Sequence, residues 1–305
     1  MIICEPCLCD CCGNEHFVEL YRMPDLRFRR FSPEYVVVEC KECGHRYLNP
    51  RPREEDLFQL YPDSYYQDRN AVAHRQAPRY LKQAEIVERY QKGGRLLDVG
   101  CAGGGWIKTM QGRGWNCTGT DIVTTSHTEA NVDIRAGALP DLDLELEGFD
   151  IITAWAVMEH VPAPSRYFAR VHKLLCDKGR FIMLVPNGDS LWSRWAYNED
   201  IPRHLHFFRK RTIKRYAKQH AFLIEKIVCS NDIYSRPASG RGLFQRRLLR
   251  LAGAPWMEMV TPVKSPTRRW FGRLGAALDY LLIHPWLEER LGMSGNMIVV
   301  LRKAG

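Results

Sequence analysis

Apolar residues recur along this chain with two different periods, and their order predicts an α/β fold. Short apolar-rich runs bounded by glycine or charge indicate strands at residues 94–100, 117–121, 132–134, 148–155 and 179–187. Helical spacing lies at 54–60, 79–90, 105–110 and 166–175. Strands that alternate with helices form a mainly parallel sheet whose faces are covered by the helices.

Composition places the chain among ordinary globular proteins. It has 305 residues, of which 45% are hydrophobic and 26% charged, so disordered and collagen-like classes are excluded. There is no run of about 18 apolar residues that would predict a membrane-spanning helix. The first residues, MIICEPCLCDCC, lack the basic and apolar regions of a signal peptide. We therefore expect a cytoplasmic protein.

Positive charge is concentrated in one C-terminal segment. Residues 203–273 carry 17 basic and 3 acidic residues, whereas the remaining chain carries 27 basic and 32 acidic ones. This asymmetry favours an anionic partner for that segment.

Seven of the eleven cysteines lie in the first 43 residues, in closely spaced pairs. Cys9 and Cys12 form one Cys-x-x-Cys-Gly pair, and Cys40 and Cys43 form a second. Two such pairs supply the four thiolates that structural zinc prefers, and the following glycines allow tight turns. The strand-like run 35–38 between the pairs is typical of a zinc ribbon or treble-clef hairpin. We expect Cys9, Cys12, Cys40 and Cys43 to bind a structural zinc ion.

A second assignment of the first zinc pair stays open. Cys4 and Cys7 also have Cys-x-x-Cys spacing, although no glycine follows them. They rank behind Cys9 and Cys12 for that reason. Otherwise Cys4, Cys7 and Cys11 are surplus thiols near the start of the chain.

The loop after the strand at 94–100 is rich in small residues and indicates a nucleotide-like ligand. A dinucleotide motif would need glycine where Ala102 stands, so that motif fits only in part. S-adenosylmethionine (SAM) fits better, because acidic Asp98 suits a cationic ligand and Asp121 suits the two ribose hydroxyls. The predicted SAM-binding residues are Asp98, Gly100, Ala102, Gly104, Asp121, Ala138, Leu139 and Trp155, with Ala138 and Leu139 beside the adenine.

Four segments, in this order, resemble the class I SAM-dependent methyltransferases. They are the zinc module ending in Asn-Pro-Arg-Pro at 49–52, LDVGC at 97–101, FDIITAWAVMEHV at 149–161 and PRHLHFF at 202–208. The resemblance is closest to a bacterial methyltransferase-type-23-like subgroup. It implies a Rossmann-like sheet of seven strands with the last strand antiparallel. Residues 222–229 and 297–301 would supply strands six and seven.

Three histidines are candidate catalytic bases for methyl transfer to a hydroxyl group. His160 follows the fourth strand directly. His204 and His206 share one face if their segment is extended, and that loop is expected to cover the acceptor pocket. Similar lipid-quinone O-methyltransferases bind a divalent metal through Glu-x-x-Glu-His, but Ala156 replaces the first glutamate here, which leaves Glu159 and His160. Aromatic side chains expected to shape the pocket are Trp192, Trp195 and Tyr197.

The basic segment contains a predicted helical insertion that mixes arginine with bulky apolar residues. Such helices can lie on a membrane surface, cover a substrate or form a dimer. The expected partner is a small-molecule, sugar or lipid-linked acceptor. Two alternatives for the basic segment stay open: peripheral membrane contact through residues 240–290, and an anionic soluble acceptor such as a nucleotide sugar or a phosphorylated glycan. RNA ranks lower, because the zinc module is not strongly basic and no Asn-Pro-Pro-Tyr-like motif follows the fourth strand.

The sequence thus predicts a SAM-dependent methyltransferase, acting on an oxygen atom, with five parts. The alternatives are an RNA methyltransferase and a non-catalytic scaffold with a degenerate methyltransferase fold. The parts are a zinc-binding module (1–52), a helical linker or lid (53–92), a SAM-binding core (93–233), a basic helical insertion (234–294) and a last core strand (295–305).

Overall fold

The computed structural model describes residues 2–28, 34–61, 73–122, 129, 131–190, 193, 200–233, 242–254, 263, 265–283 and 285–304. Trp192, Trp195 and Tyr197, together with parts of the predicted insertion, lie outside these residues. The chain divides into two compact units, each built from segments that are distant in sequence. The first contains Met1–Leu60, Pro186–Lys210 and Val228–Met297, and the second contains Tyr61–Val185, Arg211–Ile227 and Ile298–Gly305.

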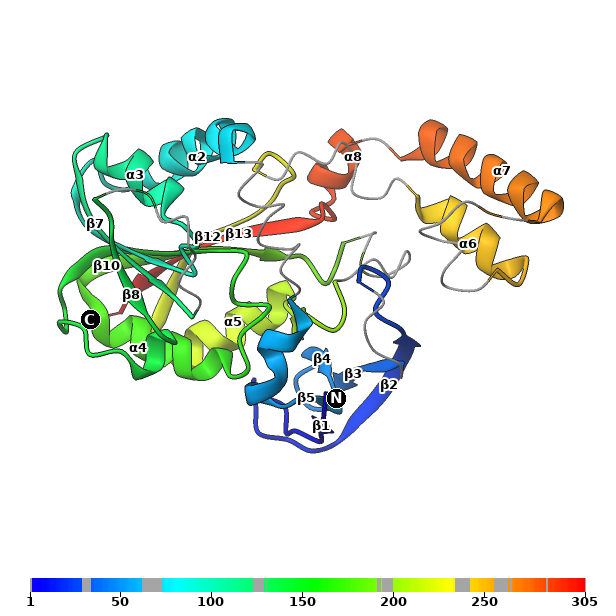
Figure 1. The fold of residues 1–305 in the computed structure, drawn as a ribbon, viewed down its shortest axis with the longest axis horizontal. Coiled ribbons are helices and arrows are strands. Elements are labelled where there is room, and N and C mark those ends of the chain that lie inside the picture. Colours follow the sequence, from blue (N-terminus) through cyan, green and yellow to red (C-terminus); the bar gives the residue numbers. More distant parts are fainter. Residues whose placement is uncertain are drawn as a thin grey trace. The chain divides into compact units, whose positions relative to one another are not determined.

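A seven-stranded sheet forms the centre of the second unit (Figure 1). Its strand order is β12-β13-β10-β9-β6-β7-β8. The pairs β9–β10, β6–β9, β6–β7 and β7–β8 are parallel. The strands are β6 (Gly94–Val99), β7 (Trp115–Asp121), β8 (Asp133–Ala136), β9 (Phe149–Trp155), β10 (Leu175–Pro186), β12 (Phe222–Cys229) and β13 (Asn296–Lys303).

The last strand runs against its neighbours, as predicted. The Asn187 amide, just after β10, donates a hydrogen bond to the carbonyl of Gly295, just before β13. The Ala304 amide, just after β13, donates to the carbonyl of Ala221, just before β12. The end of one strand therefore meets the start of the next, which defines antiparallel pairing. The predicted mixed sheet of seven strands with one antiparallel strand is confirmed.

Helices cover both faces of this sheet (Figure 1). Helices α2 (Ala73–Glu88) and α3 (Gly105–Gln111) lie on one face, and α4 (Pro164–Leu174) and α5 (Lys210–Gln219) lie on the other. Phe168 of α4 stacks on Tyr216 of α5 with ring centroids 5.0 Å apart. Burial of such rings contributes a large share of core stability.

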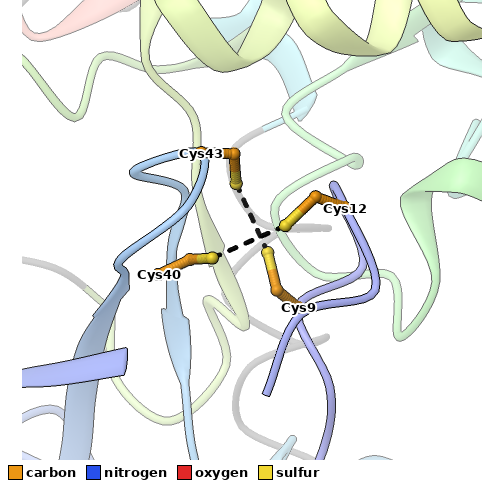
Figure 2. Close-up of side chains that lie close together, drawn as sticks. All are labelled: Cys9, Cys12, Cys40 and Cys43. Atoms are coloured by element: carbon orange, nitrogen blue, oxygen red, sulfur yellow. Dashed lines mark hydrogen bonds between the residues drawn. The ribbon is translucent and has the colours of Figure 1, made fainter. Parts of the chain in front are cut away.

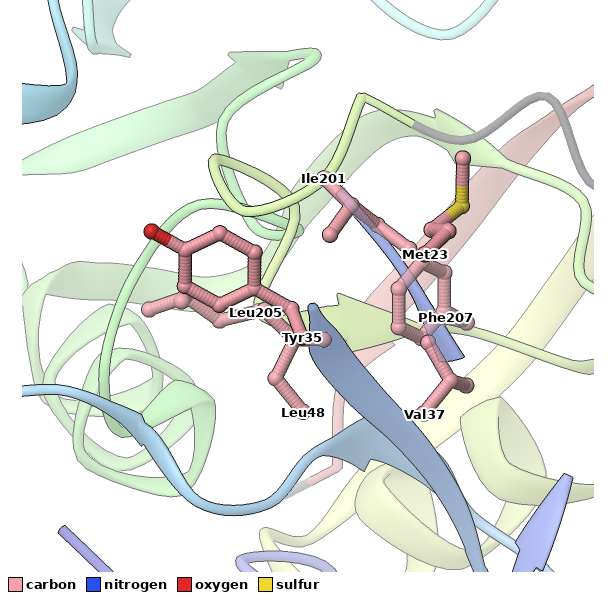
Figure 3. Packing of buried hydrophobic residues seen from close by; sticks show 7 residues of the cluster. All are labelled: Met23, Tyr35, Val37, Leu48, Ile201, Leu205 and Phe207. Carbon is pink, nitrogen blue, oxygen red and sulfur yellow. The ribbon is translucent and has the colours of Figure 1, made fainter. Parts of the chain in front are cut away.

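The first unit contains a four-stranded antiparallel sheet of order β11-β4-β3-β2, together with a short β1–β5 pair. Strand β11, from the distant 200–208 segment, pairs with β4. The buried cluster in Figure 3 joins this segment to the N-terminal sheet through Met23, Tyr35, Val37, Leu48, Ile201, Leu205 and Phe207. The strands are β1 (Cys4–Glu5), β2 (Phe17–Met23), β3 (Tyr35–Cys40), β4 (Arg46–Leu48), β5 (Arg51–Pro52) and β11 (His206–Phe207).

A buried arginine fixes the same segment to the N-terminal sheet. The Arg203 side chain is fully buried and forms ion pairs with Asp25 at 2.8 Å and Asp200 at 2.6 Å. Arg203 lowers the pKa of Asp200 to about 2, against the opposing effect of burial. Removing one partner from such a buried network typically costs about 3–5 kcal/mol. The contact therefore holds 200–208 in the first unit.

The first unit also contains the 3₁₀ helix η1 (Glu54–Leu60) and helices α6 (Leu243–Leu251), α7 (Pro266–Leu282) and α8 (Pro285–Arg290). Within the part of the chain that the structure describes, no helix combines the length and apolar character needed to cross a bilayer.

Candidate functional site

Four cysteine sulfurs converge in the first unit (Figure 2). The Sγ atoms of Cys9, Cys12, Cys40 and Cys43 all lie within 4.8 Å of one another. Cys9 Sγ lies 3.6 Å from Cys43 Sγ, and Cys12 Sγ lies 3.5 Å from Cys40 Sγ. Sulfurs bound tetrahedrally to one zinc ion lie about 3.8 Å apart. The donor set therefore fits zinc in number, type and spacing.

The turns that present these sulfurs have the geometry that their glycines suggest. The Gly13 amide donates to the Cys9 carbonyl at 2.7 Å, and the Gly44 amide donates to the Cys40 carbonyl at 2.9 Å. Both glycines have positive φ, 73° and 67°, which L-residues with side chains rarely adopt. The His45 amide donates to Cys43 Sγ at 3.4 Å. An amide directed at a thiolate stabilises the negative charge there.

The other early cysteines do not belong to this group of four. Cys4 lies in β1, opposite Pro52 of β5. The Cys7 amide donates to Asn49 Oδ1 at 3.0 Å, and its thiol donates to the Leu48 carbonyl. Cys11 is buried beside the group, and hydrogen bonds from Cys11 and Cys9 lower the pKa of Cys43. The geometry thus favours Cys9 and Cys12 over Cys4 and Cys7 as the first zinc pair.

The glycine-rich loop of the second unit connects β6 to α3 at the carboxyl edge of the sheet. Gly100, Ala102 and Gly104 all have positive φ, at 71°, 50° and 83°. The Gly100 and Cys101 amides donate to the Thr120 carbonyl, which ties the loop to β7. The Ala102 amide donates to Asp121 Oδ2 at 2.8 Å. A carboxylate accepts several hydrogen bonds, so Asp121 can also accept hydrogen bonds from ribose hydroxyls.

Asp98 is a buried acid at the end of β6. Its carboxyl accepts a 2.7 Å hydrogen bond from the Thr153 hydroxyl of β9. Burial raises the pKa of Asp98 to about 7; the Thr153 hydrogen bond acts in the opposite direction, while the nearby Asp121 charge adds to the rise. A carboxyl that is poorly solvated and close to a second acid favours a cation. This environment suits the positively charged end of SAM.

The remaining predicted SAM residues lie near the ends of β7, β8 and β9. Ala138 and Leu139 follow β8 at the start of a short 3₁₀ turn, and Leu139 is buried. The Gly137 amide donates to the Asp121 carbonyl at 2.9 Å, which brings this turn to the end of β7. Trp155 ends β9, and its buried indole Nε1 has no hydrogen-bond partner among the described residues. These positions remain predictions as ligand contacts.

His160 lies in the turn that follows β9. Its Nδ1 is 3.2 Å from the Tyr61 hydroxyl, and its Nε2 is 3.9 Å from the carboxylate of buried Glu159. The His160 side chain is 23% exposed, so it is accessible to a reactant. A histidine held between a phenol and a carboxylate can take up a proton and be stabilised in its charged form.

His204 and His206 belong to the first unit. His206 lies in β11, is buried, and its Nδ1 is 3.0 Å from Nε2 of buried His45. Burial and the adjacent His206 lower the pKa of His45 to about 3, so His45 stays neutral. The pair joins β11 to the zinc module. Catalytic roles for His204 and His206 remain predictions.

The sequence reasoning did not identify three contacts around the second-unit site. Thr153 bonds Asp98, Tyr61 bonds His160, and Tyr80 of α2 packs against the loop, since a Cβ on Gly105 would lie 3.1 Å from its hydroxyl. The polar residue Thr153, which stands among the apolar residues that follow Asp150 in β9, is the one sequence signal that could have revealed its role. The contacts of Tyr61 and Tyr80 depend on how the chain runs before β6, which the sequence does not reveal.

We predict that Gly100→Ala destabilises the second unit. A Cβ at this position would lie 2.4 Å from Val157 Cγ2, and such overpacking costs about 1–3 kcal/mol. Gly114→Ala is the matched control, because Gly114 also has positive φ but nothing lies within 4 Å of its added Cβ. Thermal unfolding should show a larger fall in Tm for Gly100→Ala. Equal falls for the two variants would mean that backbone strain alone, and not crowding, limits this turn.

Comparison with known proteins supports a methyltransferase. A family model described as a methyltransferase domain matches residues 70–226, just over half of the 305 residues. The ubiquinone biosynthesis O-methyltransferase of Bartonella quintana (strain Toulouse) is 27% identical over 159 residues, which cover 48% of this chain and 61% of that protein. The enzyme of the same name from Pseudomonas aeruginosa (strain UCBPP-PA14) is 30% identical over 134 residues, covering 39% and 58%. This chain therefore spans only about 60% of the length of these relatives.

A solved structure shows the same fold. It is a complex between the Haloferax volcanii Trm112 methyltransferase activator and a methyltransferase, with a TM-score of 0.52 and 12% identity over 80% of this chain and 96% of that chain. The family match includes the glycine-rich loop, both strand-end aspartates and the turn that carries His160. The chain therefore belongs to the methyltransferase domain family.

Proposed function

We propose that this protein is a SAM-dependent methyltransferase and that it transfers a methyl group to an oxygen atom of a small molecule, a sugar or a lipid-linked precursor. His160 carries the proposal, because it lies at the carboxyl edge of the sheet and is held by two polar partners. The names of the two relatives support oxygen as the acceptor atom. Their low identity and partial coverage leave the acceptor molecule to experiment.

Asp98 and Asp121 are the proposed anchors for SAM. When bound there, SAM supplies a methyl group that is already electrophilic. Asp98 would face the charged end of the cofactor, and Asp121 would accept hydrogen bonds from the ribose hydroxyls. The backbone turn at Gly100–Gly104 allows close approach, because its positive φ angles direct the chain around the site. Holding both reactants in line accounts for most of the catalysis expected.

His160 is the proposed base. Its imidazole takes the hydroxyl proton of the acceptor as the oxygen becomes methylated. Tyr61 orients the ring through Nδ1, and Glu159 stabilises the resulting imidazolium from 3.9 Å. General base catalysis of this kind contributes about 10²–10⁴-fold.

A structural zinc ion is the proposed occupant of the four-cysteine group. Four sulfur ligands complete a tetrahedral site and leave no position for a reactant. Zinc there would hold together the turn that precedes β2 and the turn that connects β3 to β4. Its role is therefore to stabilise the first unit.

The test begins with product identity. The protein and isotope-labelled SAM are incubated with a small-molecule extract of the source cells, and mass spectrometry follows labelled products. We expect a product bearing a labelled methyl ether. A product labelled only on nitrogen or carbon would rule out the oxygen acceptor.

The same assay then tests the base. We predict that His160→Asn lowers kcat about 10²-fold or more and leaves SAM affinity unchanged, because the base acts only on the acceptor. His16→Asn is the control, since His16 is exposed in the N-terminal module. If His160→Asn turns over at the wild-type rate, His160 is not the base.

A further inference from the structure

Helices α6 and α7 form a closely packed pair within the first unit. A Cβ on Gly275 would lie 2.3 Å from the Gln245 backbone, so the two helices approach closely there. Gly272 packs against Leu249. The carboxylate of Asp279 accepts hydrogen bonds from the Phe244 and Gln245 amides, at 2.8 and 3.1 Å, and caps the start of α6. These contacts fix which face of α7 points away from α6.

The opposite face of α7 carries an exposed apolar stripe. Trp270, Leu274 and Leu281 are spaced four and seven residues apart, which places them on one side of a helix. They are 60%, 39% and 74% exposed. Exposed Ala277 fills the gap in the stripe, and Tyr280 beside it is 74% exposed. Exposed apolar side chains that gather on one side of a helix are a candidate binding surface.

Arginine accompanies this stripe, and exposed acid is missing from the two helices. Together α6 and α7 contain six arginines and a single acidic residue, Asp279, which is only 3% exposed. The cap that Asp279 forms on α6 explains its burial. The arginines are Arg246, Arg247, Arg250, Arg268, Arg269 and Arg273. The two helices therefore carry a net charge of +5, six arginines less one aspartate, beside the apolar stripe.

We propose that the α6–α7 pair binds the surface of a bilayer that contains anionic lipids. Helices that lie in a membrane interface combine an apolar face bearing Trp and Leu with arginine beside it. Tryptophan and tyrosine favour the headgroup level, where Trp270 and Tyr280 would lie. Anionic headgroups would pair with the arginines. A second copy of this surface fits less well, because arginine would face arginine with no exposed acid on either pair of helices.

Vesicle binding by the full-length protein tests this surface. The probes are vesicles of phosphatidylcholine alone and vesicles that also contain about 30% phosphatidylglycerol, with sedimentation as the readout. We expect at least about tenfold stronger partitioning onto the anionic vesicles, weakened by salt. Equal partitioning onto the two kinds of vesicle, or none onto either, would overturn the proposal.

Paired variants locate the contact. Leu274→Glu with Leu281→Glu should abolish vesicle binding, and both positions are exposed, so the fold should survive. Leu146→Glu with Leu223→Glu adds the same charge at exposed positions, 58% and 48%, outside the helix pair and should bind as the wild type does. Circular dichroism and Tm check folding, and methylation activity need not change. If the two double variants lose binding equally, net charge rather than this stripe drives it and the proposal fails.

Light scattering tests the other possible occupant of the stripe, which is a second copy of this protein. A dimer that forms in the wild type, dissociates in Leu274→Glu with Leu281→Glu, and does not bind vesicles would assign the stripe to a second copy and overturn the membrane proposal. A monomer that binds anionic vesicles would support it.

Discussion

Replacing Cys40 with serine is expected to release zinc and to unfold the N-terminal sheet of the first unit. Cys40 lies at the end of β3, and its sulfur is 3.5 Å from that of Cys12. Zinc sites of this kind contribute about 10–16 kcal/mol to the folding of small modules. The sheet they hold is short, and part of its core comes from Ile201, Leu205 and Phe207. Losing the metal should therefore also release the 200–208 segment.

Metal analysis and thermal unfolding measure this effect. The wild-type protein should contain about one zinc ion per chain, and Cys40→Ser much less, with an early unfolding transition. Cys4→Ser is the matched control, because Cys4 lies in β1 outside the group of four. A Cys40→Ser protein that retains its zinc would disprove the assigned ligands. Loss of zinc in Cys4→Ser would return Cys4 to the ligand set.

Asp98→Asn is expected to remove most of the SAM affinity and its pH dependence. A buried carboxylate that pairs with a cation typically contributes about 2–5 kcal/mol to binding. Its loss should therefore raise the Kd for SAM about 30-fold or more. Asparagine keeps the shape of Asp98 and can still accept the Thr153 hydrogen bond. The charge is thus the main difference between the two proteins.

The sign of the pH dependence follows from the raised pKa. Burial moves the pKa of Asp98 from 3.8 to about 7, so the folded protein without ligand binds this proton more tightly than the unfolded chain does. As pH rises from about 4 to about 7, Asp98 ionises in the unfolded chain but stays protonated in the folded protein, so the folded state loses about 4 kcal/mol of stability relative to the unfolded chain. A bound cation favours the ionised form. SAM should consequently bind about tenfold more weakly for each pH unit below 7, and with constant affinity well above it.

Calorimetry between pH 5.5 and about 8.5 checks both parts of this prediction. The wild type should release a proton on binding SAM near neutral pH, and Asp98→Asn should not. Asp177→Asn, at an exposed position, is the control and should follow the wild-type curve. A wild-type Kd that is constant over this range would show that Asp98 does not titrate with binding. Stronger binding at low pH would contradict the proposed role of the carboxylate.

The parts of the fold that depend on local pattern could be predicted from the sequence. The strand at Phe222–Cys229 has the predicted bounds, and β6, β7 and β9 differ from their predicted ranges by at most two residues. Strand β10 begins at Leu175, four residues early, in a stretch where its register against β9 shifts. Each cysteine pair lies in a glycine turn, as its spacing predicts. These features need only neighbours in sequence.

Features that depend on contacts between residues far apart in the chain could not be predicted from the sequence. Strand β11 is only two residues long, and it forms because it pairs with Arg46 and Tyr47 of β4. The contact of buried His206 with His45, 161 positions away, could not be predicted from the spacing of the histidines. Its catalytic role stays a prediction. The link between Tyr61 and His160 also spans 99 positions.

The place of β13 in the sheet has a consequence for synthesis of the protein. This strand is the last in the sequence, yet it lies between β10 and β12. Until residues 296–303 leave the ribosome, both neighbours display unsatisfied amides and carbonyls along their length, which invites association with other nascent chains. The second unit thus closes its sheet only after β13 has been translated, and a chaperone that shields bare strand edges would favour its yield.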